Sequence, residues 1–162
     1  AAKLEKMNNI LMLAVEVLNQ YEGYDHYEDM VKGSENIYAA IEDAVSYSLT
    51  PAKAFAEAYK DSPVIYVMSS GATQKVAYSF SICLLMEMQW INSASLSTGE
   101  FFHGPFELVD RNVPYLLLMN DGNTRYMDSR ALEFLERFGA KTTVVDAKDY
   151  GLGSTISEKV KD

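Results

Sequence analysis

Four short runs of strand type in the second half of the chain alternate with helical patterns, and this alternation restricts the fold more than any other feature. The runs cover residues 63–68, 90–96, 114–119 and 142–145. Helical patterns fill 74–88 and 125–138, and the second pattern ends at Gly139, a usual helix C-cap residue. Strands that alternate with helices favour a parallel sheet covered on both faces. The sequence therefore predicts a three-layer α/β/α domain with a mainly parallel sheet of about four or five strands.

The N-terminal part of the chain is expected to be helical. Apolar residues recur at helical spacing over about 4–20 and 34–48. Thr50 followed by Pro51 is typical of the start of a further helix, which runs to about Lys60. The apolar stripe of the first helix is wider than a lone surface helix needs, so we expect it to pack on two sides, against a partner domain or subunit. We divide the chain into N-terminal helices (1–61), the α/β domain (62–147) and a C-terminal tail (148–162).

The charge balance disfavours several classes of partner. The 162 residues carry a formal net charge of −9, which argues against nucleic acid and anionic membranes, because both bind basic surfaces. The apolar runs fall far short of the roughly 20 residues that span a bilayer. The single cysteine, Cys83, cannot form an internal disulfide, and with no signal peptide recognised we expect a cytoplasmic protein. Two histidines and one cysteine without paired spacing argue against a zinc site.

A loop of small residues, Ser69-Ser70-Gly71-Ala72-Thr73, follows the first predicted strand and leads into a helix. In open parallel sheets, ligands bind beyond the carboxyl ends of the strands. Small residues let the backbone approach a ligand closely, and a helix N-terminus favours an anion. Ser69, Ser70, Gly71 and Thr73 are therefore candidate substrate-binding residues. The alternative is an ordinary strand-to-helix turn capped by serine or threonine.

Glu87 stands out because of its neighbours. It follows the apolar run 82–86 near the predicted end of a helix, a position that disfavours negative charge. We expect this helix to be buried, and an apolar setting destabilises the ionised carboxylate, which makes it a stronger proton acceptor. Glu87 is therefore a candidate catalytic base. The alternative is that its side chain turns to solvent at the helix end.

His103 lies in a constrained loop. Phe101 and Phe102 precede it and are expected to anchor the loop, and the Gly-Pro pair after it fixes a tight bend. An imidazole held in this way suits proton transfer near neutral pH. A lone histidine is more often structural, and we interpret His26, in an acidic and aromatic segment, as such a surface residue. His103 is therefore the second candidate for proton transfer.

Residues 97–107, Ser-Thr-Gly-Glu-Phe-Phe-His-Gly-Pro-Phe-Glu, resemble the signature of the sugar isomerase (SIS) family. In the isomerase domain of glucosamine-6-phosphate synthase, a similar Gly-Glu-x-x-His-Gly-Pro run follows the second strand of the second SIS half, and a catalytic glutamate ends the preceding helix. The spacing from that glutamate to the histidine is the sixteen residues that separate Glu87 from His103 here. The resemblance covers about residues 63–145 and implies a flavodoxin-like SIS domain in which Glu87 and His103 are catalytic.

The Phe-Phe pair before His103 indicates a subfamily. The synthase-like pattern has lysine just before the histidine, whereas this chain has Phe102. The run Phe-Phe-His-Gly-Pro-Phe-Glu looks more like the fructosamine-6-phosphate deglycases, such as fructoselysine-6-phosphate deglycase. That resemblance implies hydrolysis of a phosphorylated Amadori compound to glucose 6-phosphate and an amine. It also implies a second SIS half, a dimer or higher oligomer, and an active site between subunits into which the histidine reaches from a neighbour.

In the mechanism that the resemblance implies, Glu87 removes a proton from C1 of an open-chain 1-amino-1-deoxyfructose 6-phosphate, and His103 assists ring opening or acts as the acid at oxygen. The adjacent carbonyl stabilises the carbanion, so no metal or redox cofactor is needed. Two alternatives stay open: a sugar-phosphate isomerase or synthase half with the same C1–C2 proton transfer, and a non-catalytic SIS module that binds a sugar phosphate. Retention of both Glu87 and His103 favours an enzyme.

Overall fold

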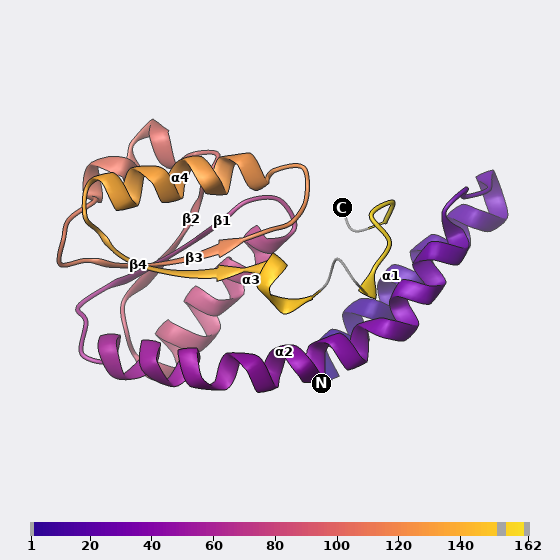
Figure 1. Cartoon of the computed structure of the whole chain (residues 1–162), viewed down its shortest axis with the longest axis horizontal. Coiled ribbons are helices and arrows are strands. Elements are labelled where there is room, and N and C mark those ends of the chain that lie inside the picture. The colour runs from indigo at the N-terminus through magenta and orange to yellow at the C-terminus, as the bar shows by residue number, and fades with distance from the viewer. Residues whose placement is uncertain (1, 152–154, 161–162) are drawn as a thin grey trace. The chain divides into compact units, whose positions relative to one another are not determined.

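The computed structural model describes residues 2–151 and 155–160, and within it the chain divides into two units (Figure 1). One unit comprises residues 1–47 and 150–162, and the other comprises residues 48–149. The second unit holds the predicted sheet and every candidate site residue. The domain boundaries expected from the sequence stay a prediction.

The sheet consists of β1 (Ile65–Ser69), β2 (Ser93–Ser97), β3 (Pro114–Met119) and β4 (Lys141–Asp146). The strand order is β2-β1-β3-β4, and every neighbouring pair is parallel. In this register Val67 of β1 lies between Ser95 of β2 and Leu116 of β3. The predicted parallel sheet is confirmed, with four strands among the described residues.

Helices cover both faces of the sheet (Figure 1). On one face lie α3 (Thr73–Ser79) and the π-helix η1 (Phe80–Met88), and on the other lies α4 (Arg125–Arg137). Because alternate residues of a strand point to opposite faces, each face has its own core. The residues buried toward α3 and η1 are Ile65, Val67, Ala77, Leu85 and Leu116. Those buried toward α4 are Met68, Phe101, Tyr115, Leu117, Met119, Ala131 and Leu135. The predicted three-layer α/β/α architecture is therefore confirmed.

Two helix predictions differ from the structure. The stretch 74–88 is helical, as predicted, but it changes from α-helix to the wider π-helix at Phe80. The separate helix predicted after Thr50 is wrong, because α2 (Tyr27–Tyr59) continues through Pro51. Proline removes one backbone hydrogen bond from a helix interior, and the alanine-rich sequence after it favours helix strongly. The Thr50–Pro51 pair, which is typical of a helix start, therefore lies inside one continuous helix.

The first unit pairs α1 (Ala2–Glu22) with the first part of α2. Asn8 Nδ2 donates to Ser34 Oγ at 2.8 Å, and Val15 of α1 is buried. The predicted first helix is confirmed, and its wide apolar stripe leaves residues such as Ile10 exposed. Among the described residues, no helix is both long enough and apolar enough to cross a membrane.

Candidate active site

Two side-chain hydrogen bonds fix the alignment of α3 and η1 along β2. Gln74 Nε2 donates to Ser95 Oγ at 3.1 Å, and Ser81 Oγ donates to Ser93 Oγ at 2.7 Å. From the first pair to the second, the residue number increases in the helical segment and decreases in β2. The helical segment α3–η1 therefore runs antiparallel to β2. Glu87 comes six residues after Ser81 and therefore lies past Ser93, beyond the amino end of β2.

The last turn of η1 is exposed to solvent. Met86, Glu87 and Met88 are all exposed, whereas Leu85 is buried against the sheet. The predicted burial of Glu87 is wrong for the single chain, because the helix extends past the strand that would cover it. The Glu87 carboxylate is therefore accessible to a ligand or to another chain. Solvent is excluded from it only when such a partner is in contact.

A strained residue, Trp90, follows the end of η1 by two positions. Trp90 has a φ of 58°, in the left-handed region that glycine usually occupies after a helix. The Ile91 N–H donates to the Leu85 carbonyl at 2.9 Å and so closes the helix end. An L-residue in this region costs roughly 1–2 kcal/mol. Trp90 is the only non-glycine residue with positive φ in the described parts of the chain.

His103 lies in a turn anchored by an aromatic side chain. The turn consists of two 3-10 helices, η2 (Phe101–His103) and η3 (Pro105–Leu108). Phe101 is fully buried and packs edge-on against Phe134 of α4, with ring centroids 5.7 Å apart. The imidazole of His103 is exposed. The predicted aromatic anchoring of this loop is confirmed.

Two further contacts hold this turn against α4 and β3. The Arg130 guanidinium lies over the Phe102 ring, 4.1 Å from its centroid. The Tyr115 hydroxyl donates to the Leu108 carbonyl at 3.0 Å, and burial raises the pKa of Tyr115. The turn is therefore fixed at both ends and presents His103 to solvent from a rigid base.

Glu87 and His103 belong to layers on opposite faces of the sheet. The helix that carries Glu87 packs in the same core as Val67. Phe101, two residues before His103, packs with Met68 in the core on the α4 face. Because the sheet separates these two layers, the structure does not bring the two side chains together within one chain.

The hydroxyls of the predicted substrate-binding loop make internal hydrogen bonds. Ser69 Oγ donates to the Leu118 carbonyl at 2.7 Å and lies 2.5 Å from Thr73 Oγ1. Ser70 Oγ accepts from Asn120 Nδ2 at 2.7 Å, and Thr73 Oγ1 donates to the Ser70 carbonyl at 2.9 Å. These contacts favour the alternative of an ordinary strand-to-helix turn without a role in ligand binding. The capping expected in that alternative is not seen, because the hydroxyls bond to the sheet and its loops and do not cap α3. A role in binding substrate stays a prediction for this loop.

Gly71 is required by both its backbone conformation and its packing. Its φ is +54°, and a Cβ atom at this position would lie 2.5 Å from Thr124 Oγ1. That oxygen accepts hydrogen bonds from Ser70 Oγ at 3.0 Å and from Asn120 Nδ2 at 3.1 Å. Glycine therefore lets the turn after β1 close against the residues that precede α4.

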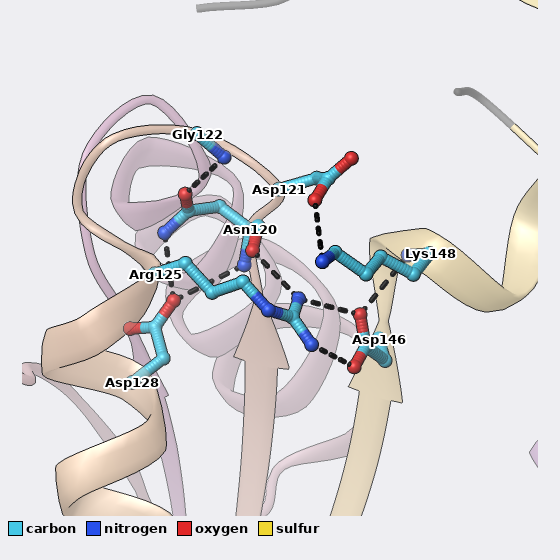
Figure 2. A network of polar contacts seen from close by, with 7 residues as sticks. All are labelled: Asn120, Asp121, Gly122, Arg125, Asp128, Asp146 and Lys148. Carbon is cyan, nitrogen blue, oxygen red and sulfur yellow. Dashed lines mark hydrogen bonds and ion pairs between the residues drawn. The ribbon is translucent and has the colours of Figure 1, made fainter.

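A buried polar network that the sequence reasoning missed joins the carboxyl ends of the strands (Figure 2). The fully buried Asp128 accepts from Thr98 Oγ1 at 2.8 Å. It also accepts from the backbone N–H of Asn120 at 3.1 Å and from Asn120 Nδ2 at 2.7 Å. A signal existed in the sequence, because Asp128 precedes Ala131 by three residues and Leu135 by seven, on the apolar side of the helix. A carboxylate on a buried stripe predicts a polar partner.

An ion pair extends the network to β4 (Figure 2). Arg125 Nη1 and Nη2 donate to the two Asp146 carboxylate oxygens at 2.7 and 2.5 Å, and Nη1 also donates to the Asn120 carbonyl at 2.9 Å. The hydrogen bond from Arg125 lowers the pKa of Asp146. Lys148 Nζ lies 3.4 Å from Asp121 Oδ1. Paired polar groups therefore hold the carboxyl ends of β3 and β4 together.

The two exposed side chains offer acid–base chemistry. A carboxylate and an imidazole are the groups most often used for proton transfer in enzymes. In the part of the chain that the structure describes, no group of three or more histidine, cysteine, aspartate or glutamate side chains could hold a metal ion. The catalytic roles of Glu87 and His103 stay predictions.

Comparison with known proteins gives a consistent set of relatives. No protein-family model matches the chain. The chain is 42% identical over 144 residues to fructosamine deglycase FrlB of Bacillus subtilis, a match that covers 89% of this chain and 44% of that protein. It is 32% identical over 91 residues to fructoselysine 6-phosphate deglycase of Escherichia coli, covering 56% of this chain and 27% of that protein.

A solved structure is similar over nearly the whole chain. It is a protein of Salmonella typhimurium called a phosphosugar isomerase, with a TM-score of 0.88 and 40% sequence identity. The match covers 92% of this chain and 46% of that chain. This chain therefore spans less than half the length of these three relatives.

Proposed function

Since this chain belongs to the fructosamine deglycase-like SIS-domain proteins, we propose that it supplies one half of an enzyme that releases the amine from a 6-phosphorylated fructosamine and yields glucose 6-phosphate. The observation that carries the proposal is the identity of 42% to a fructosamine deglycase over 89% of this chain. The matched region includes the Glu87–His103 spacing that the resemblance to SIS enzymes assigns to catalysis.

The reaction uses proton transfer between C1 and C2 of the open-chain sugar. Glu87 takes a proton from C1, next to the C2 carbonyl, and an enaminol forms. A proton then adds at C2, which converts the bond between C1 and nitrogen into an imine. Water adds to the imine carbon, the C–N bond breaks, and the amine leaves while C1 becomes an aldehyde. His103 supplies or accepts the proton at the sugar oxygen during ring opening or enolisation.

Each active site draws Glu87 from one chain and His103 from another. The two side chains lie in layers on opposite faces of one sheet, and both are exposed. A small sugar phosphate therefore meets both only where two copies come together. This arrangement gives a homodimer or a higher oligomer as the active form.

Phosphate binding falls mainly to the other SIS half of the longer protein. In this chain the hydroxyls of Ser69, Ser70 and Thr73 already make internal hydrogen bonds at the carboxyl ends of the strands. Direct contact with a phosphate would require these bonds to break. The exposed Gly71 can still offer its backbone to a ligand.

The test is an assay of the full-length protein with fructoselysine 6-phosphate, in which release of free lysine is measured. Glu87→Gln keeps the shape of the side chain and removes the base, and we expect activity to fall by about 10²–10⁴-fold. Glu133→Gln, an exposed glutamate on α4, is the matched control and should leave activity unchanged. Near-wild-type activity of Glu87→Gln would refute the assignment. Conversion of fructose 6-phosphate without amine release from fructoselysine 6-phosphate would indicate an isomerase instead.

A further inference from the structure

The imidazole of His103 is not oriented by a polar partner of its own. It is exposed, and among the described residues no side chain forms a hydrogen bond or an ion pair with it. In many histidines that transfer protons, a hydrogen bond to one ring nitrogen fixes the orientation of the other. The position of this ring therefore depends on the backbone of its turn and on the neighbouring side chains.

The backbone on both sides of His103 is constrained. The His103 N–H donates to the Glu100 carbonyl at 2.9 Å, which closes the first 3-10 turn. Gly104 follows with a φ of +156°, a conformation that glycine adopts more readily than other residues. Beyond it, the Glu107 N–H donates to the Gly104 carbonyl at 3.0 Å. The neighbour that remains is the side chain of Phe102, which directly precedes His103.

The Phe102 ring is held by two side chains of α4. It packs edge-on against Phe134, with ring centroids 5.5 Å apart, and the Arg130 guanidinium lies over it, 4.1 Å from its centroid. Arg130 and Phe134 are four residues apart, so they lie on the same face of the helix. Phe102 is half-buried, and without the guanidinium more of its ring would face water.

The contact of Arg130 is closer than a similar contact on the same helix. Arg137 lies over Phe138 at 5.8 Å, near the limit of about 6 Å for a cation–π contact. Arg130 also has no competing acid, because within residues 2–151 and 155–160 no acidic side chain lies at ion-pair distance from it. A guanidinium stays charged at all ordinary pH values and stacks well on aromatic rings. Arg130 can therefore remain on the Phe102 ring.

We infer that Arg130 is a positioning residue for His103. Its guanidinium holds the Phe102 ring against α4, the ring holds the turn, and the turn sets where the imidazole lies. Arg130 itself touches no substrate, and its effect reaches the reaction only through His103. The inference rests on the proposed function, because it requires that His103 transfers a proton to or from the sugar. A proton-transfer group that is misplaced loses rate although its chemistry is intact.

The placement of the imidazole can be measured without substrate, by NMR of the histidine rings at constant pH. The chain has two histidines, and His26 lies in the first unit, so its signals are an internal reference. Arg130→Met removes the charge and keeps a long side chain. The His103 signals should then move toward those of an unstructured histidine, because the turn samples more positions relative to the aromatic rings. Arg130→Lys keeps a cation and should give signals close to the wild type.

A double variant tests whether Arg130 acts through the Phe102 ring. Phe102→Leu removes the ring on which the guanidinium lies. The addition of Arg130→Met to Phe102→Leu should then cause no further change in the His103 signals. A further change as large as that of Arg130→Met alone would mean that the guanidinium acts by another route, and it would overturn the inference.

The effect on the reaction is measured in the full-length protein with fructoselysine 6-phosphate. The strength of an exposed cation–π contact corresponds to a fall in kcat of about two- to fivefold for Arg130→Met. KM should stay unchanged, because no contact with bound substrate is lost. Arg130→Lys should recover most of the rate. Arg137→Met, the matched control on the same helix, should retain all of it.

Three further results would overturn the inference. One is a set of His103 signals in Arg130→Met that matches the wild type, and another is a changed set with an unchanged kcat. The third is a raised KM at an unchanged kcat, which would make Arg130 a substrate-binding residue. Failure of the proposed function is seen separately. A wild-type protein that releases no amine from fructoselysine 6-phosphate refutes that function, while the His103 signals still show whether Arg130 holds the imidazole in place.

Discussion

Replacement of Asp128 by alanine should be among the most destabilising single changes in the second unit. The carboxylate is fully buried and accepts from Thr98 Oγ1 at 2.8 Å and from two donors of Asn120 at 3.1 and 2.7 Å. Loss of a buried acceptor leaves such donors without partners, at a cost of about 1–3 kcal/mol each. Partial rearrangement and entry of water reduce the sum, so we expect a loss of about 3–5 kcal/mol in the free energy of unfolding.

The assay is urea unfolding of the 162-residue chain at neutral pH, followed by far-ultraviolet circular dichroism. Asp128→Asn is the graded variant, because the amide keeps one acceptor for Asn120 while its NH₂ group can donate to the Thr98 hydroxyl. We expect it to cost roughly half as much as Asp128→Ala. Glu133→Ala, exposed on the same helix, should change the free energy by less than about 0.5 kcal/mol. A loss below about 1 kcal/mol for Asp128→Ala would refute the view that this network holds the strand ends together.

Three further predictions concern the backbone and the ion pair. Trp90→Gly should be more stable than Trp90→Ala by about 1 kcal/mol, because only glycine relieves the left-handed strain, and equal urea midpoints for the two variants would contradict this. Gly71→Ala should lose about 2 kcal/mol or more in thermal unfolding, because its Cβ would lie 2.5 Å from Thr124 Oγ1 in a left-handed conformation; an unchanged melting temperature would contradict it. The hydrogen bond from Arg125 lowers the pKa of Asp146 below its ordinary 3.8, so the stabilisation is complete above that value and is lost as pH falls through the folded-state pKa. In urea unfolding between about pH 5 and pH 2, Asp146→Asn should therefore lose less stability on acidification than the wild type, and identical profiles would refute that role.

Local apolar pattern was enough to predict the sheet but not every helix boundary. The run 114–119 matches β3, because all but one of its residues are buried and a buried strand reads as a continuous apolar run. The run 90–96 begins before β2, because Trp90 and Ile91 lie in the segment that closes the end of η1 and leads to the strand. Apolar character alone cannot separate a helix end from a strand start.

Burial was harder to predict than secondary structure. The apolar sequence around Glu87 indicated a buried helix, but the last turn of η1 extends past the amino end of β2 and is exposed. Where a helix ends relative to a strand depends on long-range contacts such as Ser81 to Ser93, which no local pattern reveals. Asp128 shows the reverse case, since its place on the apolar stripe of α4 was visible but its partners come from distant loops.

In the proposed enzyme, Glu87 of one copy and His103 of another act on the same fructosamine. In the full-length protein, Glu87→Gln and His103→Asn are produced with different affinity tags, alone and together, and mixed oligomers are isolated through both tags. Each variant alone should have lost most of its activity, since each site then lacks one group. Mixed oligomers should recover amine release from fructoselysine 6-phosphate, because some sites receive both intact residues. If mixed oligomers stay as inactive as the separate variants, Glu87 and His103 do not meet across copies.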